Sequence, residues 1–152
     1  MKTLIVYYTR TGTTKIAADA LAKELSADVE EIKDSVDYSG VFGYMKAGRD
    51  ALRKKESVIQ EHKYDPAKYE LVVIGTPVWA GLCAPAVRAY IKNHKQFFKN
   101  AAAFTTQGGA KRQGVFDEIK EQLGRELLAE LYLTTKEVRA GNFGEKLKKF
   151  IQ

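Results

Sequence analysis

The sequence predicts an α/β fold: a three-layer α-β-α sandwich in which helices cover both faces of a five-stranded parallel sheet. Short apolar runs, typical of strands buried on both faces, alternate along the chain with segments whose apolar residues recur every three or four positions. The length of 152 residues suits a single domain spanning 1–152, and 45% hydrophobic with 29% charged residues is an ordinary globular composition. We therefore expect one domain built from successive βαβ units.

Five apolar segments are the expected strands. The run Leu-Val-Val-Ile at 71–74 is the clearest buried strand, because it is continuous and rich in β-branched residues. The expected strands in chain order are residues 2–8, a short segment marked by Val29 and Ile32, residues 71–74, residues 101–105, and a segment in which Leu131 and Leu133 alternate.

Helical periodicity appears between these strands. Pro85 fits the first position of the helix that follows the third strand. The predicted buried stripes are Ile16, Ala17, Ala20, Leu21 and Leu25; Val87, Tyr90 and Ile91; Val115, Phe116, Ile119 and Leu123; and Phe143, Leu147, Phe150 and Ile151 in a terminal helix.

Residues 34–63 have the weakest pattern. Residues 38–40 have the composition of a loop, and residues 44–55 predict a helix with Met45, Ala51 and Leu52 directed inward. The Asp65-Pro66 pair predicts a turn or a helix start.

The loop at residues 9–14 connects the first predicted strand to the first predicted helix and has the sequence Thr-Arg-Thr-Gly-Thr-Thr. The first amides of a helix have no intrahelical acceptor, so this junction attracts anions. Threonine hydroxyls donate to phosphate oxygens, and Gly12 lets the backbone approach closely. The alternative is that one threonine merely caps the helix, but a cap needs one hydroxyl and the loop has four.

Two further loops follow the third and fourth strands and therefore share the same sheet edge, where α/β proteins bind ligands. Residues 76–81 contain the only tryptophan, Trp79, whose ring could stack on a flat ligand, although a core tryptophan is the alternative. Residues 106–109 offer the Gln107 amide and two glycines. The three loops together predict a ligand with a phosphate at one end and a planar ring system at the other. The phosphate-loop motif of nucleoside triphosphatases and the Gly-x-Gly-x-x-Gly motif are both absent, which argues against those ligand classes.

These motifs resemble those of flavodoxins. Residues 9–14 resemble the Thr/Ser-x-Thr-Gly-x-Thr phosphate loop of that family, and Gly-Thr-Pro-Val-Trp from Gly75 resembles its ring-stacking loop, within an element order that is similar across the chain. The resemblance implies FMN as cofactor, a strand order of 2-1-3-4-5 and one- or two-electron redox chemistry. The residues it assigns to the cofactor are Thr9, Arg10, Thr11, Gly12, Thr13 and Thr14 in the first loop, Thr76, Pro77, Val78, Trp79, Ala80 and Gly81 in the second, and Thr106, Gln107, Gly108 and Gly109 in the third.

The charge departs from that family, whose electron carriers are typically acidic. The net charge is +6, and all of it lies from Pro77 onward, with no acidic residue between 77 and 112. Such a block predicts an acidic partner or an anionic ligand, with a solvated helix face as the alternative. Our hypothesis is that Lys111 and Arg112 stabilise anionic reduced FMN. The third loop also lacks the second aromatic wall common in the family.

The remaining reactive side chains carry no motif. Cys83 is the only cysteine, which fits a small buried thiol and a reducing compartment, and with no signal-peptide or membrane-span pattern predicts a cytoplasmic protein. His62 and His94 lack metal-ligand spacing, and we expect His94 at the surface. We therefore expect no metal and assign no catalytic acid, base or nucleophile.

Three functional classes follow. The first is an electron carrier between protein partners, with a redox partner that the basic charge predicts to be acidic. The second is an NAD(P)H-dependent FMN reductase acting on a quinone or similar acceptor. The third is a flavodoxin-like interaction protein without FMN. Nucleic acid is not expected, because no aromatic-basic pattern accompanies the charge, and the oligomeric state stays open.

Overall fold

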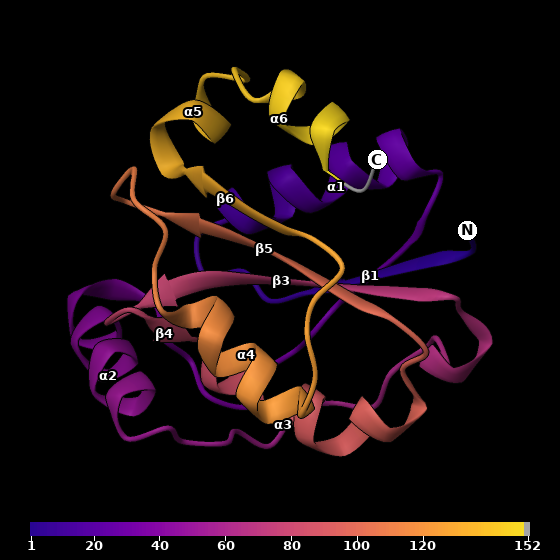
Figure 1. Cartoon of the computed structure of the whole chain (residues 1–152). Coiled ribbons are helices and arrows are strands. Elements are labelled where there is room, and N and C mark those ends of the chain that lie inside the picture. The colour runs from indigo at the N-terminus through magenta and orange to yellow at the C-terminus, as the bar shows by residue number, and fades with distance from the viewer. Residues whose placement is uncertain (151–152) are drawn as a thin grey trace.

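The computed structural model describes residues 1–150 and contains a twisted parallel sheet between two layers of helices (Figure 1). The parallel strands lie in the order β2-β1-β3-β5-β6, which is the predicted order 2-1-3-4-5 when they are counted along the chain. Their bounds are β1 (Thr3–Tyr7), β2 (Asp28–Glu31), β3 (Leu71–Trp79), β5 (Ala101–Gln107) and β6 (Glu130–Thr134). The predicted α/β sandwich and strand order are therefore confirmed.

Helices cover both faces of this sheet (Figure 1). One face carries α1 (Thr13–Leu25), α5 (Thr135–Arg139) and α6 (Gly144–Lys149). The other carries α2 (Gly40–Leu52), α3 (Pro85–His94) and α4 (Val115–Leu123). Two 3₁₀ turns, η1 (Pro66–Lys68) and η2 (Lys95–Phe97), complete the described chain, and the Asp65 carboxylate caps η1, as the Asp65-Pro66 pair predicted. No helix in residues 1–150 combines the length and apolarity that crossing a bilayer requires.

Two hydrophobic layers flank the sheet, because successive strand residues point to opposite faces. Leu4 and Val6 join the layer under α3 and α4, whereas Ile5 joins the layer under α1 and the C-terminal helices. The stripes predicted for α3 and α4 are buried throughout. In α1, Ala17 and Leu21 are buried as predicted and Ala18 is buried with them. Ala20 and Leu25 are half-buried, and Ile16 is exposed.

The C-terminal segment forms two short helices, α5 and α6, in place of the single terminal helix predicted. A break at 140–143 separates them, and Gly141 there has a left-handed φ of 72°. Phe143, Leu147 and Phe150 are buried as predicted, while Ile151 lies outside the described residues.

The helix predicted at 44–55 begins earlier, at Gly40, and presents a different face to the sheet. Its buried side contains Gly43, Ala47 and Ala51, whereas Met45 and Leu52 are 65% and 64% exposed. The reason is close approach, because a Cβ at Gly43 would lie 2.3 Å from the carbonyl carbon of Tyr38. The small residues therefore face the fold, and the expectation that Met45 and Leu52 point inward was wrong.

Strand β3 is longer than the predicted strand 71–74, because residues 75–79 continue it instead of forming a loop. The chain then reverses through Ala80 and Gly81, with left-handed φ values of 52° and 80°, and pairs antiparallel as β4 (Leu82–Cys83). Two consecutive residues with positive φ are the signature of a tight two-residue hairpin. The predicted loop is thus a rigid hairpin that carries Trp79.

We predict opposite effects for alanine at two glycines of α2. Gly43→Ala should lower the free energy of unfolding by about 1–3 kcal/mol, because the added methyl meets the Tyr38 backbone. Gly48→Ala should raise it by about 0.5–1 kcal/mol, because its Cβ would meet nothing within 4 Å and alanine favours helix. Urea unfolding followed by circular dichroism measures both. Equal shifts in one direction would contradict the close packing described at Gly43.

Candidate functional site

A cavity of about 290 Å³ opens at the carboxyl edge of the sheet, where β1, β3 and β5 end. All three predicted loops contribute to it. The predicted site residues that line it are Thr9, Arg10, Thr11, Thr13, Thr14, Pro77, Val78, Trp79, Thr106, Gln107 and Gly108. Tyr44 and Thr135, which the sequence did not single out, line it as well.

The first loop forms a strand-to-helix junction with unbonded amides. Gly12 is the N-cap of α1 in a left-handed conformation (φ 95°), and no side chain caps the helix. Ile16 is the first residue whose N–H bonds back, to the Gly12 carbonyl at 3.1 Å, so the amides of residues 13–15 have no helical acceptor. The alternative that a threonine merely caps α1 is therefore wrong. The Thr9 hydroxyl accepts from the Gly12 N–H at 2.9 Å and shapes the loop.

A buried hydrogen bond joins the first loop to the third. The hydroxyls of Thr14 and Thr106 lie 2.8 Å apart, and both residues are buried. A threonine hydroxyl can donate one hydrogen bond and accept two. This bond therefore uses only part of the hydrogen-bonding capacity of each hydroxyl. This contact holds the start of α1 against the end of β5.

Arg139 crosses the first loop from α5. Its Nη2 donates to the Thr11 carbonyl at 2.9 Å and its Nε to the Thr13 hydroxyl at 3.1 Å. A capping box between Thr134 and Glu137 fixes the start of α5. The guanidinium therefore adds positive charge beside the unbonded amides, and no sequence motif indicated this residue.

Arg10 joins the same loop to α2. Its guanidinium donates to the carbonyls of Tyr38 and Gly40 at 2.8 and 2.9 Å and lies over the Tyr44 ring, 5.5 Å from its centroid. The sequence placed Arg10 in the cofactor loop, and here it also anchors the segment that brings Tyr44 to the cavity.

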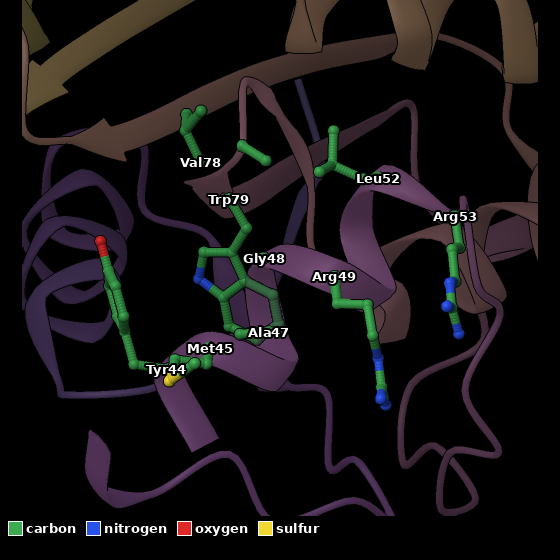
Figure 2. A pocket seen from close by; sticks show the side chains of 10 residues that line it. Tyr44, Met45, Ala47, Gly48, Arg49, Leu52, Arg53, Val78 and Trp79 are labelled. Atoms are coloured by element: carbon green, nitrogen blue, oxygen red, sulfur yellow. The ribbon is translucent and has the colours of Figure 1, made fainter. Parts of the chain in front are cut away.

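Trp79 is half-buried, with its ring held edge-to-face by two tyrosines. The ring centroids of Tyr8 and Tyr38 lie 5.6 and 4.9 Å from that of Trp79. Burial raises the pKa of Tyr8 to about 12, so this wall of the site stays uncharged. Trp79 also lines a second, larger cavity against α2 (Figure 2), so the alternative of a core tryptophan does not hold.

Five predicted site residues do not line the 290 Å³ cavity: Gly12, Thr76, Ala80, Gly81 and Gly109. Thr76 is 0% exposed, and its hydroxyl donates to the Pro77 carbonyl and accepts from the Ala84 amide, so its role here is structural. A Cβ at Gly81 or at Gly109 would lie 4.0 Å from the Gln113 side chain. The tips of the second and third loops thus flank one residue, Gln113.

The Gln107 side chain is bonded within its own loop. Its oxygen accepts from the Thr105 hydroxyl at 3.0 Å, and its nitrogen donates to the carbonyls of Gly109 and Lys111. The sequence assigned this amide to the polar edge of a ligand ring. In the structure the amide instead holds the loop in shape.

The basic block at 77–112 does not form one positive surface beside the cavity. Arg88 is buried and donates to Glu118 at 2.6 Å. Arg112 binds Asp117 and Glu130 at 3.0 and 2.8 Å, and its hydrogen bonds lower the pKa of both carboxyls. For Arg112, the hypothesis that it stabilises reduced FMN loses its support, because two carboxylates already compensate its charge. For Lys111, whose backbone carbonyl accepts from the Gln107 side chain, the hypothesis stays a prediction.

The other reactive side chains lie away from the cavity. Cys83 is fully buried, and its backbone N–H and thiol donate to Glu118 at 3.0 and 3.3 Å. The rings of His62 and His94 pack edge-to-face at 5.0 Å, and His94 also stacks on Tyr90, so it is half-buried where the sequence predicted a surface residue. Residues 1–150 contain no cluster of three or more His, Cys, Asp or Glu side chains suited to a metal ion.

One family profile and several solved structures match this chain over most of its length. The profile of the flavodoxin family matches residues 2–149. A flavoprotein of Lactobacillus acidophilus NCFM, solved in complex with FMN, is 26% identical with a TM-score of 0.75, over 91% of this chain and 97% of that one. Two further structures share the fold. A putative flavoprotein of Bacteroides uniformis is 22% identical with a TM-score of 0.78, over 97% of this chain and 96% of that one. Oxidised flavodoxin 2 of Bacillus cereus is 17% identical with a TM-score of 0.56, over 98% of this chain and 99% of that one. No curated protein matches the sequence.

We predict that native Cys83 resists alkylation. Burial raises the pKa of its thiol above the usual range, so at pH 8 the group is neutral as well as inaccessible. Iodoacetamide at pH 8 should modify the unfolded chain within minutes and the native protein at least a hundredfold more slowly, as measured by mass spectrometry. Rapid labelling of the native state would contradict this burial.

Proposed function

We propose, from the premise that this chain belongs to the flavodoxin family, that it binds FMN in the 290 Å³ cavity and transfers electrons through it. One observation carries the proposal: the cavity is lined both by the start of α1, where helix amides are unbonded and Arg139 bonds to Thr11 and Thr13, and by Trp79. FMN has the matching chemistry, a phosphate and a planar ring. The FMN-bound relative from Lactobacillus acidophilus supports this choice of cofactor.

The phosphate end fits an anion by three means. The amides of residues 13–15 donate without competition from the helix. The Thr11 and Thr13 hydroxyls border the same cavity, and Arg139 adds a charge-assisted donor. The nearest atom to a Cβ at Gly12 would be the Arg139 Nη2, at 3.9 Å, so the constraint that favours glycine here is the left-handed φ of 95° and not a lack of space.

The ring end fits a planar group between two loops. Pro77, Val78 and Trp79 provide an apolar wall, and Gly108 brings bare backbone to the facing side. The hairpin geometry of residues 80–81 and the Gln107 hydrogen bonds keep these walls in place. FMN, when bound, supplies one- or two-electron redox chemistry, and the protein supplies orientation and electrostatics.

Electron transfer to a protein partner is the role that the cavity supports best. Among its lining residues in the described chain, Arg10 and Tyr44 alone have ionisable side chains, so no carboxyl or imidazole borders the site as a proton donor. A carrier needs no such group, whereas many substrate-transforming enzymes do. The net charge of +6 favours an acidic redox partner protein.

A second candidate is an NAD(P)H-dependent reductase acting on a quinone or similar small acceptor. The observation that favours it is the larger cavity, about 640 Å³, on the α2 side of Trp79. A protein that only docks another protein does not require a hollow of this size beside the cofactor site.

We predict that Arg139→Gln weakens FMN binding about tenfold and leaves riboflavin binding within twofold, because the lost guanidinium serves the phosphate end. The matched control is Lys136→Gln, an equal change of charge on the exposed surface of the same helix. Flavin fluorescence titration measures both ligands. Equal losses for FMN and riboflavin would show that Arg139 does not act on the phosphate, and no FMN binding by the wild type would overturn the proposed function.

Mixing with NADPH separates the carrier from the reductase. For the carrier, the FMN-loaded protein under argon should keep its visible absorbance for minutes with NADPH and lose it at once with dithionite. Stopped-flow spectroscopy provides the measurement. Bleaching by NADPH within seconds would favour the second candidate.

A further inference from the structure

Helix α2 has a second apolar face that the fold leaves uncovered. Val41, Met45, Gly48 and Leu52 follow one another at spacings of four, three and four residues, so they share one side of the helix. That side is opposite the one that packs Gly43 and Ala47 against the protein. Val41 is 76% exposed, and Met45 and Leu52 are also exposed. The helix therefore buries its small residues and presents its large apolar ones outward.

Met45, Gly48 and Leu52 of this outer face line the 640 Å³ cavity, which we call the α2 groove (Figure 2). Met45 and Leu52 stand on the helix side, and Val78, Trp79 and Ala80 of the β3–β4 hairpin stand opposite. Gly48 leaves the middle open, because a Cβ there would meet nothing within 4 Å. A hollow of this volume with mostly apolar walls is typical of small-molecule sites.

Two arginines mark one end of the groove. Arg49 and Arg53 are four residues apart on α2, and their side chains extend away from Val78 (Figure 2). Arg49 pairs with Asp50 at 3.3 Å. Within residues 1–150 the Arg53 guanidinium makes no ion pair or hydrogen bond, so its donors are available to an anionic group.

The groove adjoins the candidate cofactor site. Tyr44, Val78 and Trp79 line both the groove and the 290 Å³ cavity. A molecule in the groove would therefore contact the same indole that borders the proposed flavin ring. Edge-to-face contacts with Tyr8 and Tyr38 hold that indole in place.

We propose that the α2 groove binds a planar, mostly apolar organic anion, such as a fused-ring aromatic carboxylate, with its rings along Trp79 and Met45 and its anionic group at Arg53. This inference rests on the proposed function in placing the molecule beside FMN. The apolar walls supply the hydrophobic contact and the aromatic partner. Arg53 supplies the selectivity for a negative charge over a neutral analogue.

The experiment uses FMN-loaded protein and two probes, 2-naphthoate and its neutral analogue 2-naphthamide. The chain has one tryptophan, so its single indole N–H resonance in a ¹H–¹⁵N spectrum reports on binding beside Trp79, and bound FMN occupies the other cavity that Trp79 lines. Naphthoate should shift this resonance saturably, and naphthamide should bind about three- to tenfold more weakly. No saturable shift with FMN bound would overturn the inference.

Three variants test the assignment. Gly48→Leu fills the groove and should reduce naphthoate affinity at least tenfold while FMN affinity stays within twofold. Arg53→Gln should reduce naphthoate affinity about three- to tenfold and leave naphthamide unchanged. Lys54→Gln, the neighbouring exposed cation outside the groove, is the matched control and should change neither. Unaltered naphthoate binding by Gly48→Leu would place the probe elsewhere and overturn the inference.

Titration with and without FMN separates this inference from the proposed function. Displacement of naphthoate by one equivalent of FMN would make the groove part of the cofactor site and overturn the inference. If FMN itself does not bind, the proposed function fails, and the same naphthoate titration of the FMN-free protein still supports or overturns a ligand site in the groove.

Discussion

The packing of the Phe104 ring on Gly75 is the constraint on which the carboxyl edge of the sheet depends. A Cβ at Gly75 would lie 2.3 Å from the ring carbon Cζ of Phe104 and 2.9 Å from the Cβ of Tyr7, so no larger residue fits without displacing both neighbours. Tyr7 pairs with Gly75, and Gly75 with Phe104, across the three central strands. Slipping any of these parallel strands by one residue would exchange its buried faces. The register is thereby fixed, and the three loops that follow the strands meet at one edge.

This strand register brings the loops together, and contacts between segments far apart in the chain then complete the site. The Thr14–Thr106 hydrogen bond holds the first helix against β5. Pairing of β5 with β6 sets Gln107 beside Thr134, and α5 starts at the next residue. Arg139 therefore reaches the first loop because the edge strand ends where it does. An anion site built in this way combines helix amides, hydroxyls and a guanidinium, each from a separately positioned element.

Ion pairs with carboxylates decide which of the positively charged side chains can act on a ligand. The arginines of the basic block at 77–112 are compensated, Arg88 by Glu118 in the interior and Arg112 by two surface carboxylates. Guanidinium groups from outside this block lie near the candidate ligand sites: Arg10 lines the cavity, Arg139 bonds to the Thr11 carbonyl beside it, and Arg53 lines the groove. Paired charges project little field toward a ligand, whereas an unpaired guanidinium keeps its capacity to bind an anion. The electrostatic character of the site thus depends on which cations are ion-paired within the fold, and the net charge of the sequence does not reveal it.

The sequence by itself determined the α/β class, the phosphate-loop and tryptophan-loop motifs and the family, because each depends on local periodicity or on a motif at a strand–helix junction. The strand order was implied only by the resemblance to that family. The tertiary structure alone decided which side chains complete the site. Arg139 and Thr11 are bonded across 128 positions, and Tyr44 reaches the cavity through Arg10, contacts that leave no trace in local pattern. The face that α2 buries was also beyond the sequence, because hydrophobicity favoured Met45 and Leu52 while the close approach at Gly43 required small residues. Local pattern encodes which elements form, and contacts between distant residues decide which side chains those elements present to a ligand.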